Sequence, residues 1–348
     1  MVGCTRRQFV ADSATVLAGV SVASCFPDVG GDWPVECVDY QDNTLTGPVS
    51  GSARVIEVLD PSSVTEHSEI VADKVFPMLE QALSSLADHS DPWSVLLPEY
   101  QAGMRIGLKV NCLNPSCPTS VPLVRAIVDS LKAGLNATGA DILVWDRRLD
   151  ELFNCGFTNE STGATVIGTE NSTTDANGPG YEECFCEVLG GKRTRLSRII
   201  TELTDLTLNV PVLKTHEVSG VTASLKNIYG IIDNPGSFHA DLATALPALY
   251  ALAPIRRSIK LIVVDALVAV TVGGTASPTD TTPKRIFVAR DPLAADLYAL
   301  DLVNKMREEK RALGIQVTNV DGKSLTWLDN AYALGLGTNT YDLTTIER

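Results

Sequence analysis

Lysines, histidines and an asparagine gather in one short stretch of this 348-residue chain, PVLKTHEVSGVTASLKNIYGIIDNPGSFH at residues 211–239. The stretch holds two of the four histidines, His216 and His239, together with Lys214 and Lys226. Lysine ammonium groups bind anions as point charges, while histidines move protons near neutral pH or ligate metals as neutral imidazoles. These residue types therefore indicate an anion-binding pocket that could also carry acid–base or metal chemistry.

Five apolar runs of the chain end in polar residues of the same kind. These are Lys109 with Asn111, Asp146, Lys214 with His216, Asp265, and Asp291. Side chains two residues apart on a strand share a face, and ligands of open α/β sheets bind outside the carboxyl ends of the strands. We therefore expect all of these side chains to converge on one pocket. For Asp291, which precedes Pro292, an N-cap role is the alternative.

A helical pattern over 222–232 supplies a second wall of this pocket. Gly220 lets the backbone turn closely past a ligand, and Thr222 and Lys226 lie one helical turn apart, so their side chains share a face. A helix that begins near Thr222 would also offer free N–H groups to an anion. Asn227 can orient an amide, a carboxylate or a phosphate. The predicted substrate-binding residues are Lys109, Asn111, Lys214, Thr222, Lys226 and Asn227.

The pocket needs a sheet to position it, and the chain alternates short β-branched runs with helical patterns. Strands are predicted at 54–59, 105–111, 141–146, 209–216, 260–265 and 285–291, and helices at 68–86, 121–135, 222–232, 240–252 and 292–312. Such alternation predicts an α/β fold, a mostly parallel sheet with helices on both faces. A Gly-, Asn- and Thr-rich region near 156–192 predicts an irregular insert. We expect one domain over 53–348, preceded by a tether at 26–52.

The composition is that of a globular protein with a sizeable core, since 45% of residues are hydrophobic and 20% charged. The formal net charge is −14, and there is no basic stripe. Nucleic-acid binding rests on lysine and arginine neutralising phosphates, so this class of partner is excluded. The acidity indicates a well-solvated surface.

Residues 1–25 predict export. TRRQF at residues 5–9 resembles a twin-arginine signal, and the apolar stretch that follows is too short and too polar for a membrane span. Val22-Ala23-Ser24-Cys25 resembles a bacterial lipobox, which predicts lipidation of Cys25 and a lipid anchor. Cleavage nearby with release of a free protein is the alternative. We expect a protein in the periplasm or at the extracytoplasmic face of the membrane.

The remaining cysteines allow two interpretations. Cys112 and Cys117 flank a short proline-containing loop, which predicts a disulfide in an oxidising compartment. Alternatively, Cys112, Cys117, Cys184 and Cys186 gather round a metal or an iron–sulfur cluster, although the spacings usual for zinc and ferredoxin sites are absent. A divalent metal held by His216 or His239 with an aspartate is a further alternative.

NVPVLKTHEVSGVTASLKNIYGIID at residues 209–233 resembles the signature of the domain of unknown function 362 family, v-P-v-l-K-t-H, g-v-T and a-l-K-N-l-f-G. Residues 109–111 resemble its K-P-N with valine for proline, and residues 291–296 resemble its D-P-v-A-l-D. The resemblance covers Ala53 to Asp342, with a departure at 273–278. Members of this family are largely uncharacterised, and some carry a ferredoxin-like iron–sulfur module. This chain has no ferredoxin-type cysteine run, so the resemblance does not imply electron transfer.

Two functions fit these residues. The first is an enzyme acting on a small anionic substrate, with lysines binding it, His216 and His239 as catalytic acid–base groups, and Asp146, Asp265 and Asp291 in support. The second is a surface lipoprotein that captures an anion or a metal without catalysis. The histidines favour the enzyme, because plain capture has no need of a proton shuttle. No nucleophile elbow, Walker loop, GxGxxG run or HExxH motif fixes a reaction type.

Overall fold

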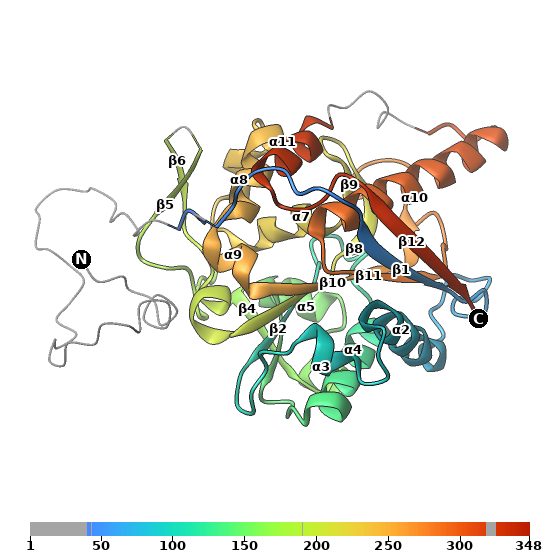
Figure 1. The fold of residues 1–348 in the computed structure, drawn as a ribbon, viewed down its shortest axis with the longest axis horizontal. Helices are drawn as coiled ribbons and strands as arrows, with labels where there is room; N and C mark the ends of the chain where they lie inside the picture. The colour runs from blue at the N-terminus through green and yellow to red at the C-terminus, as the bar shows by residue number, and fades with distance from the viewer. Residues whose placement is uncertain (1–39, 43, 190, 318–324) are drawn as a thin grey trace, which may run out of the picture.

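The computed structural model describes residues 40–42, 44–189, 191–317 and 325–348 (Figure 1). Among these residues, ten strands form one sheet in the order β12-β1-β11-β10-β7-β2-β3-β4, with β8 beside β10 and β9 beside β8. The strands are β1 (Ala53–Leu59), β2 (Ile106–Lys109), β3 (Ile142–Arg148), β4 (Thr165–Glu170), β7 (Leu206–Asn209), β8 (Val212–His216), β9 (Gly220–Thr222), β10 (Ile259–Val270), β11 (Arg285–Ala289) and β12 (Tyr341–Glu347).

The predicted mostly parallel sheet is confirmed, with two strands that differ, β11 and the short β9, which runs antiparallel to β8. β10, β7, β2, β3 and β4 run parallel to one another, as do β8 with β10 and β12 with β1. β11 runs antiparallel to both β10 and β1. It follows β10 through a connection without a helix, whereas a parallel return requires a crossover that is usually helical.

Helices cover both faces of the sheet (Figure 1). Alternate residues of β10 show the two faces, because Ile262 packs into one hydrophobic core and Val263 into the other. The first face carries α7 (Ser224–Asn227), α8 (Leu242–Ala251), α9 (Ala253–Ser258), α10 (Pro292–Ala312) and α11 (Thr326–Leu334). The second face carries α2 (Ala72–Ala87), α3 (Pro92–Leu96), α4 (Val121–Leu135) and α5 (Leu149–Asn154). The short α6 (Asn159–Thr162) packs against α4.

Two of the predicted elements around the pocket have different boundaries. The strand predicted at 209–216 is divided into β7 and β8 around Pro211, whose nitrogen has no hydrogen to donate to the sheet. The helix predicted at 222–232 is shorter, because 220–222 is strand β9, paired with β8 as an antiparallel hairpin. Only α7 and a 3₁₀ turn, Ile228–Ile231, remain helical.

The region predicted as an irregular insert contributes to the main sheet. Its residues 165–170 form β4, which pairs in parallel with β3. The rest includes a separate two-stranded ribbon of β5 (Cys186–Leu189) and β6 (Lys192–Thr194). A π-helical turn, Ile199–Leu203, then leads back to the sheet. The glycine within TVIGTE weakens the strand pattern, which explains why β4 was not predicted.

The end of the predicted tether packs against the domain. The buried Asp42 carboxylate pairs with Arg256 at 2.7 Å and with Arg257 at 2.9 Å, and both arginines belong to α9. The Tyr40 carbonyl also accepts a hydrogen bond from the backbone N–H of Ala253. The predicted export signal and Cys25 lie outside the described residues. Within the described part of the chain, no helix combines the length and the apolar character that a membrane span needs.

Candidate functional site

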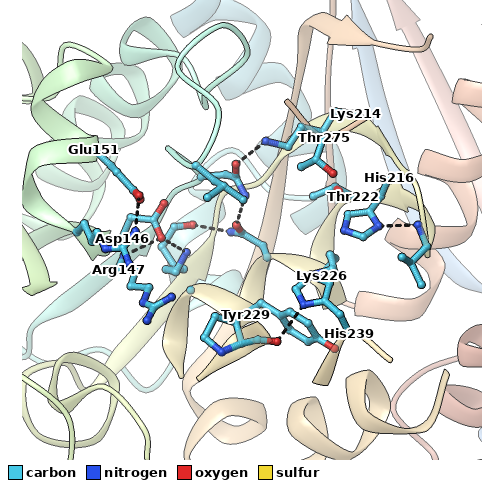
Figure 2. Close-up of a pocket in the computed structure, with 18 of the residues that line it drawn as sticks. Asp146, Arg147, Glu151, Lys214, His216, Thr222, Lys226, Tyr229, His239 and Thr275 are labelled. Carbon is cyan, nitrogen blue, oxygen red and sulfur yellow. Dashed lines mark hydrogen bonds and ion pairs between the residues drawn. The ribbon is translucent and has the colours of Figure 1, made fainter. Parts of the chain in front are cut away.

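A pocket of about 360 Å³ lies at the carboxyl ends of β2, β3 and β8. Nine of the eleven residues predicted for a shared pocket line it: Lys109, Asn111, Asp146, Lys214, His216, Thr222, Lys226, Asn227 and His239. Figure 2 shows Asp146 on one wall and Lys214, Thr222 and His216 on the wall that faces it. Residues more than 100 positions apart therefore meet because parallel strands end at the same edge of the sheet.

The hairpin of β8 and β9 builds the cationic wall. Lys214 and His216 share one face of β8, as their spacing predicts. Lys214 lies directly opposite Thr222, and His216 opposite Gly220, in the antiparallel register. Gly220 adopts a φ of 80°, a left-handed conformation that glycine tolerates and that closes the hairpin tightly. Cross-strand pairing, and not a shared helix, thus brings Thr222 beside the lysine.

Lys214 is a buried cation held by a chain of amides. Its Nζ donates to Asn111 Oδ1 at 2.7 Å, and Asn111 Nδ2 donates to Asn227 Oδ1 at 3.0 Å. Asn227 Nδ2 in turn donates to Asn209 Oδ1 at 2.8 Å, so each amide orientation is fixed by the next. Burial lowers the pKa of Lys214, and no carboxylate of the described residues forms an ion pair with it.

Lys226 is a second buried lysine without a carboxylate partner among the described residues. Its Nζ lies 3.4 Å from the centroid of the Tyr229 ring and 3.5 Å from His239 Nε2. Burial, together with the charge of Lys214, lowers its pKa to about 7. The nearby Glu217 carboxylate accepts hydrogen bonds from the backbone N–H and the hydroxyl of Thr275. An anion between the two lysines would favour the charged form of both.

The two pocket histidines have opposite hydrogen-bonding roles. His216 Nδ1 accepts from the backbone N–H groups of Val218 at 3.0 Å and Ser219 at 3.2 Å, so its ring proton sits on Nε2. His239 Nδ1 lies 3.0 Å from the Pro235 carbonyl, which can only accept, so its proton sits on Nδ1. His216 therefore offers a donor, whereas His239 offers the lone pair of Nε2, which lies 3.5 Å from Lys226 Nζ.

The protonation of these histidines follows from their surroundings. Burial, reinforced by the charge of Lys226, lowers the pKa of His216 to about 3, which keeps the ring neutral. Burial and Lys226 also lower the pKa of His239. The rings stack with centroids 6.0 Å apart and an interplanar angle of 14°. Protonating His216 would break its two backbone hydrogen bonds, so of the two predicted acid–base groups the geometry suits His239.

Lys109 and Asp146 form a neutral pair on the opposite wall. Lys109 Nζ donates to Asp146 Oδ1 at 2.7 Å, and Asp146 Oδ2 accepts from the backbone N–H of Cys112 at 2.7 Å. Gly230 packs directly on this pair, since a Cβ there would lie 2.6 Å from Asp146 Oδ1 and 2.7 Å from Lys109 Nζ. The charge of Lys109 is thus compensated within the protein.

Thr222 supplies a further group for a ligand. Its Oγ1 is buried, lines the pocket and has no hydrogen-bond partner in the described structure. Buried hydroxyls are nearly always hydrogen-bonded, so an unpaired one at a pocket wall indicates a position where a ligand or a water binds.

Several lining residues were not predicted. They are Leu113, Arg147, Arg148, Glu151, Glu217, Val218, Tyr229, Gly230, Pro235 and Thr275. Arg147 and Arg148 are the last two residues of β3, which continues past the predicted end at Asp146, and their position directly after that residue is the signal that could have found them. Thr275 comes from the loop at 273–278 that departs from the family pattern. A Cβ on Gly274 would lie 1.7 Å from Glu217 Oε1, so this loop packs tightly against the cationic wall.

Asp265 and Asp291 do not line the pocket, and their predicted supporting role is corrected. β10 continues beyond Asp265 to Val270, and the buried Asp265 carboxylate accepts from Ser120 N at 2.7 Å. β11 runs antiparallel, which sends its carboxyl end to the other edge of the sheet. There Asp291 caps α10 by accepting from the backbone N–H groups of Leu293 and Ala294, the alternative role weighed above.

The expected anion site at a helix N-terminus is also corrected. The buried Asp296 carboxylate accepts from the backbone N–H groups of Ser224 at 2.6 Å and Leu225 at 2.9 Å, the first residues of α7. Burial raises the pKa of Asp296 to about 7. The N–H groups assigned to a ligand are therefore occupied by a carboxylate of the protein itself.

The cysteines do not form the predicted disulfide or a four-cysteine site. Cys112, Cys117 and Cys186 are free thiols, and Cys184 is disulfide-bonded. Cys117 packs with Val212 and Val270, whereas the Cys112 carbonyl lies 3.6 Å from the Sγ of Cys155. The two side chains of the short loop thus lie in different surroundings. Among the described residues, no three histidine, cysteine or acidic side chains are grouped as metal ligands.

Comparison with known proteins identifies the family. The sequence model described as Domain of unknown function (DUF362) matches residues 106–301, more than half of the chain. The chain belongs to this family. The DUF362 match contains β2, β3, β8, α7 and every predicted residue that lines the pocket. No curated protein matches the chain in sequence.

Two solved structures resemble this DUF362 chain weakly. One is the lactate racemase apoprotein from Thermoanaerobacterium thermosaccharolyticum, with 12% identity and a TM-score of 0.41 over 77% of this chain. The other is a structural-genomics target from Thermotoga maritima, with 12% identity and a TM-score of 0.41 over 69% of this chain. The chain covers 60% and 59% of their respective lengths. Likeness this low carries no argument about activity.

Proposed function

We propose that this DUF362 protein is an enzyme that binds a small organic anion between Lys214 and Lys226 and moves a proton through His239. One observation carries the proposal. Two buried lysines without carboxylate partners among the described residues face one pocket, beside the unpaired hydroxyl of Thr222. Burying uncompensated cations is costly, so a protein that keeps two together gains from a counter-charge that arrives as a ligand.

The pocket fits a ligand of limited size. Its volume of about 360 Å³ is at the small end of ligand sites. The other cations that line the pocket have carboxylate partners within the protein. Arg147 lies 3.8 Å from Glu170, Arg148 lies 3.0 Å from Glu151, and Lys109 lies 2.7 Å from Asp146. The free positive charge therefore lies on the two buried lysines, which favours a small carboxylate or phosphate over an extended polyanion.

Each pocket group has a role in the proposed reaction. The lysine ammonium groups and the Thr222 hydroxyl bind the anionic group, and the Nε2–H of His216 donates to an oxygen of the substrate. His239 Nε2 accepts a proton from the substrate as a general base. Lys226 lies 3.5 Å from that nitrogen with a pKa of about 7, so it can return a proton near neutral pH.

The binding part is tested by thermal unfolding with a panel of carboxylates, phosphates and other oxyanions. A ligand should stabilise the wild type, and Lys214→Ala and Lys226→Ala should each weaken its binding by about 1.5–3 kcal/mol, typical of a hydrogen bond to a charged group. That corresponds to roughly tenfold to a hundredfold in affinity. Lys305→Ala, an exposed position on α10, is the matched control. A ligand that stabilises all four proteins equally binds elsewhere, and the proposal fails.

The catalytic part is tested once a ligand is known. Proton NMR in D₂O should show turnover, or exchange of a ligand hydrogen for deuterium, with the wild type. His239→Gln keeps much of the ring's size and should retain binding but lose this activity. A wild type that binds the ligand and neither converts nor exchanges it supports the second candidate, an anion-capturing protein. The histidines favour the enzyme over that candidate, since capture requires no base beside the anion.

A further inference from the structure

A pair of cysteines lies beside the pocket, away from the groups assigned to ligand binding. Cys155 follows the last residue of α5, and its Sγ lies 3.6 Å from the backbone carbonyl of Cys112, 43 residues earlier in the chain. Each thiol also shifts the pKa of the other, as expected for two side chains that lie close together. This is the pair that the structure brings together, in place of Cys112 and Cys117.

We propose that Cys112 and Cys155 are a redox-active pair that closes to a disulfide and ties the loop after β2 to the end of α5. Sulfurs bonded to each other lie about 2.0 Å apart. Side chains already in mutual contact can reach that distance by small rotations. Cys117 cannot compete for Cys112 in this arrangement, because it is buried against Val212 and Val270.

The two sulfurs differ in exposure and in pKa, which determines the order in which they react. Cys155 is half-buried, whereas Cys112 is only 1% exposed. The neighbouring Cys112 side chain lowers the pKa of Cys155, although burial opposes it, and burial raises the pKa of Cys112. Thiolates are the attacking species in thiol–disulfide exchange, so the accessible Cys155 attacks first and the buried Cys112 resolves.

The oxidant that the reaction needs is a disulfide, either of a small thiol or of a protein. The Cys155 thiolate attacks one sulfur of that disulfide, forms a mixed disulfide and releases one thiolate. Cys112 then loses its proton, attacks the Cys155 sulfur and releases the second thiol. The two cysteines lose two electrons and two protons in total, and one disulfide becomes two thiols.

The bond would connect two parts of the pocket wall. Leu113, next to Cys112, and Glu151, on α5, both line the pocket. The backbone N–H of Cys112 is also hydrogen-bonded to Asp146 Oδ2 of the Lys109–Asp146 pair. Oxidation would therefore fix the position of Leu113, which is 63% exposed, relative to α5.

The experiment uses the full chain, first reduced and then incubated with oxidised glutathione. Peptide mapping without reductant should show a linkage between Cys112 and Cys155 and no glutathione on either residue. Cys112→Ser should leave a stable glutathione adduct on Cys155, and Cys155→Ser should leave Cys112 unmodified. Cys186→Ser, a buried thiol on β5, is the matched control and should still form the linkage.

The wild-type map alone decides the proposal if a cysteine variant does not fold. Cys112 and Cys155 both remaining free under oxidant would overturn it. A linkage of Cys112 to Cys117, or a wild-type protein that retains glutathione on Cys155, would overturn it as well.

Discussion

At the scale of single residues, the buried lysines of the pocket lower the stability of the ligand-free protein and are placed to bind an anion. Lys214 and Lys226 are desolvated without an ion pair from the described residues, and burial lowers the pKa of both. His216 is likewise kept neutral, because burial and the charge of Lys226 lower its pKa, and the backbone N–H groups of Val218 and Ser219 donate to its Nδ1. An anionic ligand would offset the free-energy cost of burying the two lysines. Each lysine should therefore destabilise the ligand-free protein.

We expect Lys226→Met to stabilise the ligand-free protein, by on the order of 1–4 kcal/mol, while weakening anion binding. This gain in the free energy of unfolding should depend on pH. Below about pH 7 the folded protein carries the buried charge in full. Between that value and 10.5 the unfolded chain holds a proton that the folded state has lost, so wild-type stability rises with pH and the gain shrinks. Urea unfolding of both proteins from pH 6 to 10 measures this, and a constant difference would contradict it.

Anion affinity should itself fall as the pH rises through about 7, because binding needs the Lys226 ammonium and the empty pocket releases that proton near neutrality. The slope approaches a tenfold loss per pH unit until the pKa of the bound state is reached. Titrations of one carboxylate ligand at constant ionic strength from pH 6 to 9 check this, with a ligand whose own charge is constant over the range. Lys226→Met should bind weakly with a flat profile over the same range.

At the scale of elements, the pocket depends on close backbone packing as much as on charge. The 3₁₀ turn after α7 presses Gly230 onto the Lys109–Asp146 pair, and the β8–β9 hairpin turns at Gly220 to set Thr222 opposite Lys214. The carboxylate of Asp296 fixes the start of α7 from a distant helix. These contacts set the distance between the two pocket walls.

Gly230→Ala should destabilise the protein by about 1–3 kcal/mol, the usual cost of overpacking a filled interior. The new methyl group would lie within 3 Å of Asp146 Oδ1 and Lys109 Nζ, so the pair must shift and the pocket with it. Gly236→Ala is the matched control, because a Cβ there meets no atom within 4 Å. Chemical unfolding and ligand affinity should change only for the first variant. If Gly230→Ala left stability and affinity as unchanged as Gly236→Ala does, the turn would tolerate a side chain and the prediction would be wrong.

The sequence predicts the pocket's members better than their arrangement. Spacing of two residues puts Lys214 and His216 on one face whatever the fold, and polar residues after apolar runs identify strand ends. Asp265 and Asp291 were misplaced because neither the length of β10 nor the direction of β11 follows from local pattern. The tautomer of His239 depends on the Pro235 carbonyl, and the cap of α7 depends on Asp296, about 70 residues away. Such contacts exist only in the folded chain.

At the scale of the whole molecule, the described chain is one layered α/β structure in which Tyr40 and Asp42 contact α9. The ion pairs of Asp42 with Arg256 and Arg257 join positions more than 200 residues apart. We propose that the preceding residues direct export through the twin-arginine route, which carries folded proteins. A fold that brings together residues from such distant strands suits transport after folding.

Replacing Arg6 and Arg7 with lysine should abolish export, because the proposed signal is read through its arginine pair. Cell fractionation and immunoblotting of tagged protein measure the exported fraction. The control is Arg54→Lys, which changes an arginine outside the proposed signal. Unchanged export would rule out the twin-arginine assignment. Separately, Cys25→Ala should release the protein from the membrane fraction if Cys25 is lipidated, and a variant still held there would contradict lipidation.

The opposite tautomers of His216 and His239 make the two sides of the pocket chemically different for a bound ligand. One ring presents a donor, the other an acceptor, and the lysines mark a third point by charge. A ligand that satisfies all three has one orientation, and its mirror image must leave at least one of them unmatched. We expect the protein to distinguish enantiomers of a chiral anion, and separate titrations of the two mirror-image compounds would reveal the preference.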